Sequence, residues 1–266
     1  MDLSKVSNYR AKRPDAWGSI RYFKEENLVW ADLYSQQIPM IRRCAATEYL
    51  EGFERIALPK DRVPDCRDLS EKLGALTGWK VTPVPALIPF ERFFSMLANR
   101  EFPAASFIRG RKDFDYITEP DIFHELFGHT PLLTDMRFAE FSRAIGQAGL
   151  RAGRLDYSWL IRLYWFSIEF GLTRQNGEIK ALGSGLASSP SELRYSVSSN
   201  VAKRREFDIM DILRTPYRID THQPIYYVLD DLDDLFGATE RDLNADVSKA
   251  RFLGLFEPEY PLKKSA

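Results

Sequence analysis

Two of the three histidines in this 266-residue sequence stand five residues apart, at His124 and His129, in the segment PDIFHELFGHTP. Imidazole binds zinc, copper and iron, so the pair indicates a metal site. The zinc-peptidase motif HExxH places its histidines four residues apart, on one face of a helix. A spacing of five separates two side chains by roughly 140° on an α-helix. One regular helix cannot direct both imidazoles at one ion. We therefore expect the helix geometry to change locally at Gly128, where a helix can end or loosen.

A metal held by these histidines needs a third ligand, and a carboxylate is the economical choice because the only other histidine is His222. Two histidines and one acid form the facial triad of non-haem Fe(II) enzymes, which disfavours zinc without excluding it. The best acid is Glu169, because its segment LIRLYWFSIEFGL reads as a helix with a nearly apolar surface. A buried carboxylate needs a cation, a strong donor or a metal beside it. The alternative is a histidine pair bonded to backbone, with Glu169 paired to Arg162 or Arg174.

Composition excludes several classes of partner and location. With a net charge of -1, the chain has no long-range electrostatic field that would attract nucleic acid or an anionic membrane. No apolar run approaches the ~18 residues of a membrane span, and the first residues lack a signal-peptide core. Cys44 and Cys66 form no CxxC motif and indicate buried, reduced thiols. We expect a cytoplasmic protein without nucleic-acid or membrane partners.

The periodicity of apolar residues predicts a mainly α fold with minor β structure. The helices are expected in two consecutive stretches over 25–58 with Pro39 interrupting, then over 65–76 closed by Gly78, 89–97 with Pro89 in its first turn, and 138–148. The strands are expected at 80–84, 106–109, 178–182 and 225–229. Because no linker or repeat divides the chain, we expect one domain over 1–266 with its core at about 8–257.

Longer segments resemble a known family, the pterin-dependent aromatic amino acid hydroxylases. The segments are PDIFHELFGH, YWFSIEFGL and LGSGLASS, with VPALIPFERFF (84–94), SFIRG (106–110), DYITEPD (115–121) and RTPYRID (214–220). The resemblance covers about nine tenths of the chain and is greatest to the short bacterial phenylalanine hydroxylases. Motifs of this length in colinear order are far more specific than a histidine pair. The resemblance implies the family's catalytic fold in one domain, a monomer, and no separate regulatory or tetramerisation domain.

The resemblance also implies an activity and a set of site residues. With dioxygen and a tetrahydropterin, such as tetrahydrobiopterin, Fe(II) on His124, His129 and Glu169 would hydroxylate L-phenylalanine to L-tyrosine. The implied pterin-binding and catalytic residues are Phe93 under the pterin ring, Leu87 and Ile88 through their backbone, Glu125 near the pterin and the metal-bound water, and Tyr164 near the iron. The implied substrate-binding residues are Arg109 for the carboxylate, steadied by Asp121, with Pro120, Trp165, Phe170, Gly185 and Ser188. On periodicity alone, Phe93 reads as ordinary helix core.

Three positions depart from the family pattern and keep alternatives open. Leu182 stands where an aromatic residue is common, Ser184 where alanine or glycine is usual, and Thr130 where valine or cysteine is more familiar. Because the loop 182–188 borders the implied substrate pocket, the same chemistry on tryptophan or tyrosine is one alternative. A zinc-dependent hydrolase is another, motivated by His-Glu followed by a histidine, and a metal-binding protein that lost catalysis is a third. We interpret His222 as structural.

Overall fold

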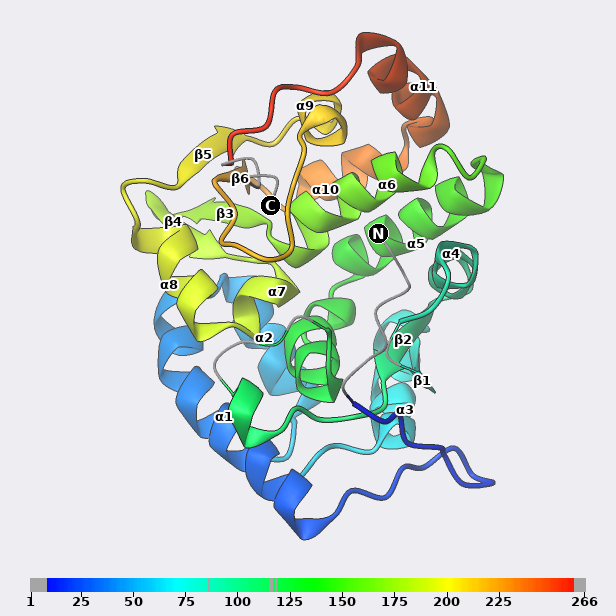
Figure 1. Ribbon diagram of the computed structural model, residues 1–266, viewed down its shortest axis with the longest axis vertical. Coiled ribbons are helices and arrows are strands. Elements are labelled where there is room, and N and C mark those ends of the chain that lie inside the picture. Colours follow the sequence, from blue (N-terminus) through cyan, green and yellow to red (C-terminus); the bar gives the residue numbers. More distant parts are fainter. Residues whose placement is uncertain (1–8, 86, 115–116, 118, 261–266) are drawn as a thin grey trace, which may run out of the picture.

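The computed structural model describes residues 9–85, 87–114, 117 and 119–260, and it is mainly helical with a minor β component, as predicted (Figure 1). The α-helices are α1 (Lys24–Cys44), α2 (Thr47–Ile56), α3 (Cys66–Thr77), α4 (Phe90–Ala98), α5 (Met136–Arg151), α6 (Tyr157–Tyr164), α7 (Ser184–Ala187), α8 (Pro190–Ser198), α9 (Ile209–Arg214), α10 (Asp233–Thr239) and α11 (Leu243–Leu253). Two π-helices, η2 (His124–His129) and η4 (Trp165–Glu169), and two 3-10 turns, η1 (Arg111–Asp113) and η3 (Leu132–Thr134), complete the helical segments. Within the described residues, no helix has the length and apolarity that crossing a membrane requires.

The strands form two small sheets. The first pairs β1 (Lys80–Val84) in parallel with β2 (Glu101–Ala105). The second has the order β4-β3-β6-β5 and contains β3 (Leu172–Gln175), β4 (Glu178–Ala181), β5 (Lys203–Glu206) and β6 (Ile225–Leu229). In this sheet β3 is antiparallel to β4 and parallel to β6, while β5 is parallel to β6. All five residues of β6 are buried, as expected for a central strand covered on both faces.

The predicted interruption at Pro39 is wrong, because Pro39 lies inside α1. The chain turns instead at Ala45 and Ala46, where the Ala46 amide donates to the carbonyl of Ala181 in β4 at 2.8 Å. A proline inside a helix costs roughly 3 kcal/mol. The buried face of α1 continues in phase across the proline and includes Val29, Trp30, Leu33, Tyr34, Gln37, Met40, Ile41 and Cys44. Burial of this face offsets the cost of the proline.

The ends of α3 and α4 follow their local signals closely. The Asp65 side chain caps α3 by accepting from the Arg67 amide, and Gly78 ends the helix in the left-handed conformation with φ 77°. Pro89 is the N-cap of α4, one residue before the predicted first-turn position.

The predicted strand over 106–109 is also wrong, since β2 ends at Ala105. The polar groups of this segment find partners outside a sheet. The Arg109 amide donates to Asp121 Oδ2 at 2.9 Å, and the Ile122 amide donates to the Phe107 carbonyl at 2.8 Å. Satisfied in this way, the segment needs no strand partner. The strands β2, β3 and β5 were not predicted. The charged sequence KRRE of β5 shows no alternation because this strand lies at a sheet edge.

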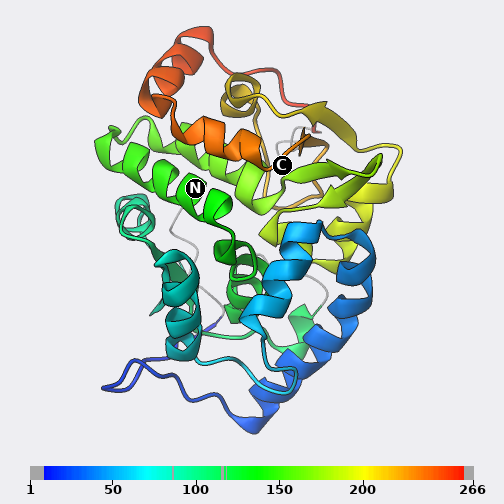
Figure 2. The same cartoon turned by 180° about the vertical axis from the view of Figure 1, so that it is seen from behind.

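One hydrophobic cluster extends from α1 to α11 through the described residues. Its largest fully buried side chains include Trp30, Tyr49, Trp79 and Phe94. Figure 1 shows α1 and α2 on one side of the molecule and α5, α6 and α10 on the other, and Figure 2 shows α5 and α10 side by side. The π-helix η2 packs between them against β2 and α7, while η4 also contacts α7. The histidine segment and Glu169 therefore meet near the centre of the core.

Candidate active site

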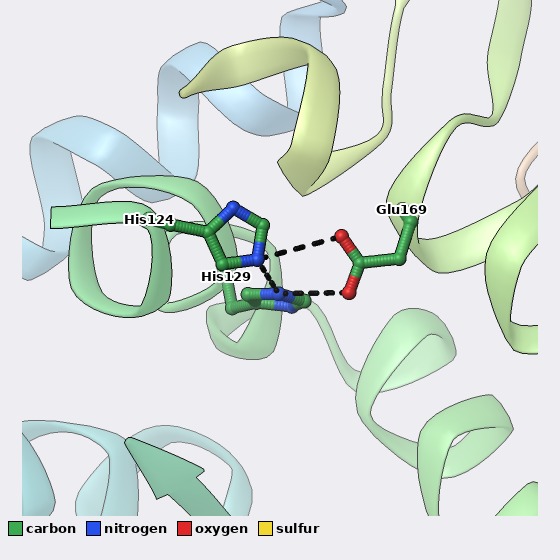
Figure 3. Close-up of side chains that lie close together, drawn as sticks. All are labelled: His124, His129 and Glu169. Carbon is green, nitrogen blue, oxygen red and sulfur yellow. Dashed lines mark hydrogen bonds and ion pairs between the residues drawn. The ribbon is translucent and has the colours of Figure 1, made fainter. Parts of the chain in front are cut away.

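The segment from His124 to His129 is a π-helix, in which hydrogen bonds join residues five apart. Residues at this spacing therefore lie on the same side, and the Nε2 atoms of the two histidines are 3.3 Å apart (Figure 3). The expected change of helix geometry is present, but it is the π-turn over the whole segment and not a helix end at Gly128. Gly128 has a different role, because a Cβ at this position would lie 2.7 Å from the Ser184 carbonyl oxygen. Its lack of a side chain allows α7 to approach η2.

Glu169 ends the second π-helix and completes the cluster. Its Oε1 lies 3.2 Å from His129 Nε2, and its Oε2 lies 3.6 Å from His124 Nε2 (Figure 3). One donor atom from each of the three residues lies within 4.8 Å of the others. In the described part of the chain no arginine or lysine pairs with Glu169. Arg174 pairs with surface acids, and Arg162 donates to a backbone carbonyl. The alternative of a Glu169–arginine pair is therefore wrong.

Burial and mutual charge set the protonation states of the cluster. Burial lowers the pKa of His124 to about 4, so the imidazole is neutral at pH 7. Burial alone would raise the pKa of Glu169, but His129 and His124 outweigh it and hold that pKa at about 2. A neutral imidazole and an ionised carboxylate are the species that bind a metal ion. Burial raises the pKa of the neighbouring Glu125 well above its usual range, and its Oε2 lies 3.9 Å from His129 Nε2.

Hydroxyl groups contact two of the three side chains of the cluster. Ser188 Oγ lies 2.8 Å from His124 Nδ1, which leaves His124 Nε2 directed into the cluster. Ser184 Oγ lies 3.2 Å from Glu169 Oε2 and 3.0 Å from the Ile168 carbonyl oxygen. Such partners of metal ligands set the ring orientation and raise affinity.

The donor set fits a mononuclear metal ion. Two imidazole nitrogens and one carboxylate, all with little solvent exposure, converge without an arginine or lysine partner among the described residues. Three protein ligands leave coordination positions open, as in the facial triad of Fe(II) oxygenases and also in catalytic zinc sites. The donor atoms alone thus indicate a catalytic type of metal site. The residues around the cluster must distinguish iron from zinc.

Two hollows meet at the cluster, and the first contains every residue implied for the pterin. It has a volume of about 150 Å³, and its lining includes Leu87, Ile88, Phe93 and Glu125 beside the three ligands. Phe93 is partly exposed there and meets the Tyr164 ring edge-on at 5.1 Å. Tyr164 lines both hollows. The buried core position next to it is Phe94, so Phe93 is not ordinary helix core.

The second hollow contains every residue implied for the substrate. It has a volume of about 290 Å³, and its lining includes Arg109, Pro120, Trp165, Phe170, Gly185 and Ser188. Arg109 is only 4% exposed, and its Nε and Nη2 each donate to Asp121 at 2.8 Å. The expected support by Asp121 is present. The rings of Trp165 and Phe170, five residues apart, lie 4.5 Å from each other because the π-turn aligns them.

Several site residues were missed by the sequence analysis. Phe102 in β2 packs over the His129 ring at 4.6 Å, and Ser184 was noted only as a departure from the family. Further lining residues of the second hollow are Glu192, Ile219, Thr221 and Gln223. They belong to α8 and the segment before β6, where nothing local distinguishes them. His222 is 45% exposed and lies outside the metal cluster.

Fold and site together define a mononuclear metal enzyme with separate room for two organic molecules beside the metal. Residues 4–249 match the family described as biopterin-dependent aromatic amino acid hydroxylase, and the chain belongs to this family. The resemblance stated from the sequence motifs is thereby confirmed.

Individual relatives are similar over nearly the whole chain. The phenylalanine-4-hydroxylase of Pseudomonas aeruginosa is 45% identical over 262 residues, which are 98% of this chain and 100% of that protein. The apo structure of the cold active phenylalanine hydroxylase from Colwellia psychrerythraea 34H has a TM-score of 0.93 at 46% identity, covering 97% of this chain and 100% of that one. The structure of Chromobacterium violaceum phenylalanine hydroxylase with bound oxidised Fe(III) has a TM-score of 0.87 at 41% identity, covering 92% and 89%.

Proposed function

We propose that this chain hydroxylates L-phenylalanine to L-tyrosine, with dioxygen and a tetrahydropterin as co-substrates, at Fe(II) bound by His124, His129 and Glu169. The observation that carries the proposal is the meeting of two hollows at a buried cluster of two imidazoles and one carboxylate. Membership in the family and 45% identity to a phenylalanine-4-hydroxylase support this choice of reaction. When bound, the iron supplies the activation of dioxygen with electrons from the pterin.

The first hollow is proposed to bind the pterin. Phe93 offers an aromatic face to a flat heterocycle, and the backbone of Leu87 and Ile88 offers polar groups at its edge. Glu125, with the raised pKa that burial causes, can hold or release a proton at Oε2 beside the pterin. Apolar neighbours of these residues keep bulk water away from the metal cluster.

The second hollow is proposed to bind the amino acid. The Arg109 guanidinium binds its carboxylate, and Asp121 holds the guanidinium in place through two hydrogen bonds and their opposite charge. Gly185 and Ser188 lie at the amino acid end, while Trp165 and Phe170 enclose the aromatic ring. These contacts orient the ring relative to the metal before reaction, which is the main contribution of such positioning residues.

Product analysis tests the proposal. Protein loaded with Fe(II) and supplied with a tetrahydropterin, oxygen and phenylalanine should form tyrosine, and parallel reactions with tryptophan and tyrosine should be slower. Chelation should abolish activity, and add-back of iron but not zinc should restore it. Hydrolase activity that returns with zinc alone would support the alternative class. Tight iron binding without pterin-dependent oxygen uptake would instead identify a protein that has lost catalysis.

We also propose that the chain acts as one catalytic domain, as a monomer, in the cytoplasm. The continuous hydrophobic cluster through the described residues supports the single domain. Cys44 and Cys66 are buried and free, which suits a reducing compartment, and burial raises the pKa of Cys66 to about 12. Light scattering at several concentrations should report one mass near 30.7 kDa.

A further inference from the structure

The indole of Trp165, in the wall of the second hollow, is held by a residue far away in the sequence. Its Nε1–H donates to Gln223 Oε1 at 3.2 Å, across 58 residues. On its faces, Trp165 contacts Phe170 and Tyr217, each at a ring-centre distance of 4.5 Å. Ring contacts restrain the plane of the indole but allow sliding, whereas the hydrogen bond determines where its edge lies. The position of this wall therefore depends on Gln223.

The side chain of Gln223 is itself fixed. It is 2% exposed, and its Nε2 donates to the carbonyl oxygens of Arg218 at 2.7 Å and Thr221 at 3.2 Å. Its backbone amide donates to Glu192 Oε1 at 2.9 Å. A buried carboxamide whose oxygen and nitrogen both have partners has a single favourable orientation.

The anchor of Gln223 is also buried. Glu192, in α8, is 7% exposed and accepts a second hydrogen bond from the hydroxyl of Tyr226 in β6 at 2.5 Å. Helix α8 thus holds the backbone of Gln223 through Glu192, and Tyr226 of β6 in turn holds the Glu192 carboxylate. Both Gln223 and Glu192 line the same hollow as Trp165. The network connects the π-helix η4 to the segment before β6 without touching the metal ligands.

We propose that Gln223 is a positioning residue that determines substrate preference by fixing the indole of Trp165. This inference rests on the proposed hydroxylation and goes beyond it, because it assigns selectivity between aromatic rings to a residue that acts through another. When the carboxamide oxygen is lost, the indole can shift and the ring pocket widens. A wider pocket favours the two-ring side chain of tryptophan over the single ring of phenylalanine.

A double-mutant cycle tests this assignment. Gln223→Met keeps the length of the side chain but removes its polar atoms, and Trp165→Phe keeps an aromatic wall but removes the donor. We expect each variant to lower the ratio of kcat/KM for phenylalanine to that for tryptophan by about 5- to 10-fold, the effect of losing one hydrogen bond. Because both act on one contact, the double variant should be no worse than the worse single variant. Independent, multiplying effects would overturn the proposal.

Two further variants separate the parts of the network. Gln223→Glu keeps an acceptor for the indole and should retain more of the preference than Gln223→Met. Thr77→Val removes another buried hydrogen bond, from Thr77 Oγ1 to the Leu133 carbonyl at 2.8 Å, and Thr77 lines neither hollow. This control should lower the melting temperature without changing the ratio. An equal change of ratio in Thr77→Val would show general loosening of the fold and overturn the proposal.

A measurement that needs no catalysis tests the role of Gln223 separately from the proposed function. The NMR signal of the Trp165 Nε1–H, assigned by its loss in Trp165→Phe, should be protected from solvent exchange in the wild-type protein. In Gln223→Met it should exchange faster, and unchanged protection would contradict the inference. A wild-type protein that binds iron but forms no tyrosine would contradict the proposed function alone, since the exchange measurement still decides whether Gln223 holds the indole.

Discussion

Glu169 and Phe93 both line the first hollow, but they have different surroundings. Glu169→Ala removes one of the three proposed metal ligands, so we expect iron affinity to fall by about 100-fold or more, with loss of activity. Phe93→Ala removes only a ring from the wall, so the KM for the pterin should rise while iron stays bound. Iron content and pterin kinetics of the two variants check this difference. Equal loss of iron from both would show that their roles are misassigned.

The hydroxyl of Ser184 contacts a metal ligand, whereas the equally buried hydroxyl of Ser142 donates only to the Phe138 carbonyl, at 2.8 Å. We therefore expect Ser184→Ala to weaken Fe(II) binding by about 10-fold, because the hydroxyl orients Glu169 Oε2. Ser142→Ala should change stability but not iron affinity. Titration against a competing chelator measures both, and equal affinities would show that Ser184 serves only its backbone partner.

At the scale of elements, the approach of α7 to η2 depends on a missing side chain. Gly128→Ala would place a Cβ 2.7 Å from the backbone oxygen of Ser184, so one element must move. We expect a loss of about 1–3 kcal/mol in the free energy of unfolding, together with weaker iron binding. Gly237→Ala in α10, where a Cβ meets nothing within 4 Å, is the control and should stabilise by about 0.5–1 kcal/mol. Urea unfolding of both variants tests the contrast.

The N-terminus of α5 should make stability depend on pH. The Asp135 carboxylate accepts from the Arg137 amide at 2.9 Å and from the Arg137 guanidinium. Burial alone would raise the pKa of Asp135, but the bonds from Arg137 outweigh it and lower that pKa. The carboxylate thus stabilises the fold above about pH 4, the ordinary Asp value, and this contribution is lost as the pH falls through the lowered pKa.

Asp135→Ala should accordingly cost about 1 kcal/mol at pH 7, and the difference from wild type should shrink below about pH 4. Denaturant unfolding at a series of pH values measures it. A difference that stays constant down to pH 3 would show that the carboxylate charge is not what stabilises this helix end.

At the scale of the whole molecule, the proposed metal site joins segments that are distant in the sequence. Its three residues come from η2 and from the end of η4, which meet only in the folded state. Fe(II) at 100 times its Kd should therefore stabilise the fold by about 2.7 kcal/mol, which raises Tm by several degrees. Anaerobic thermal unfolding with and without Fe(II) checks this. The same rise in Glu169→Ala would contradict the ligand assignment.

The features that the sequence by itself determined depend on local spacing and residue type. The signals at Gly78 and Pro89 gave their helix ends correctly or within one residue, and His124, His129 and Glu169 lie together as expected. Residue types limit the chemistry of a site, and a helix end depends on a few neighbouring residues. The family motifs added the residues implied for pterin and substrate, which line two adjoining hollows in the structure.

Only the tertiary structure decided how those parts meet. It placed Pro39 inside α1, kept 106–109 out of a sheet, and accommodated the five-residue spacing of His124 and His129 in a π-turn. It also brought Ser184 to Glu169 and Gln223 to Trp165. Each result depends on the packing of elements that are distant in the sequence. The energy of this packing outweighs local conformational preference and cannot be inferred from the spacing of neighbouring residues.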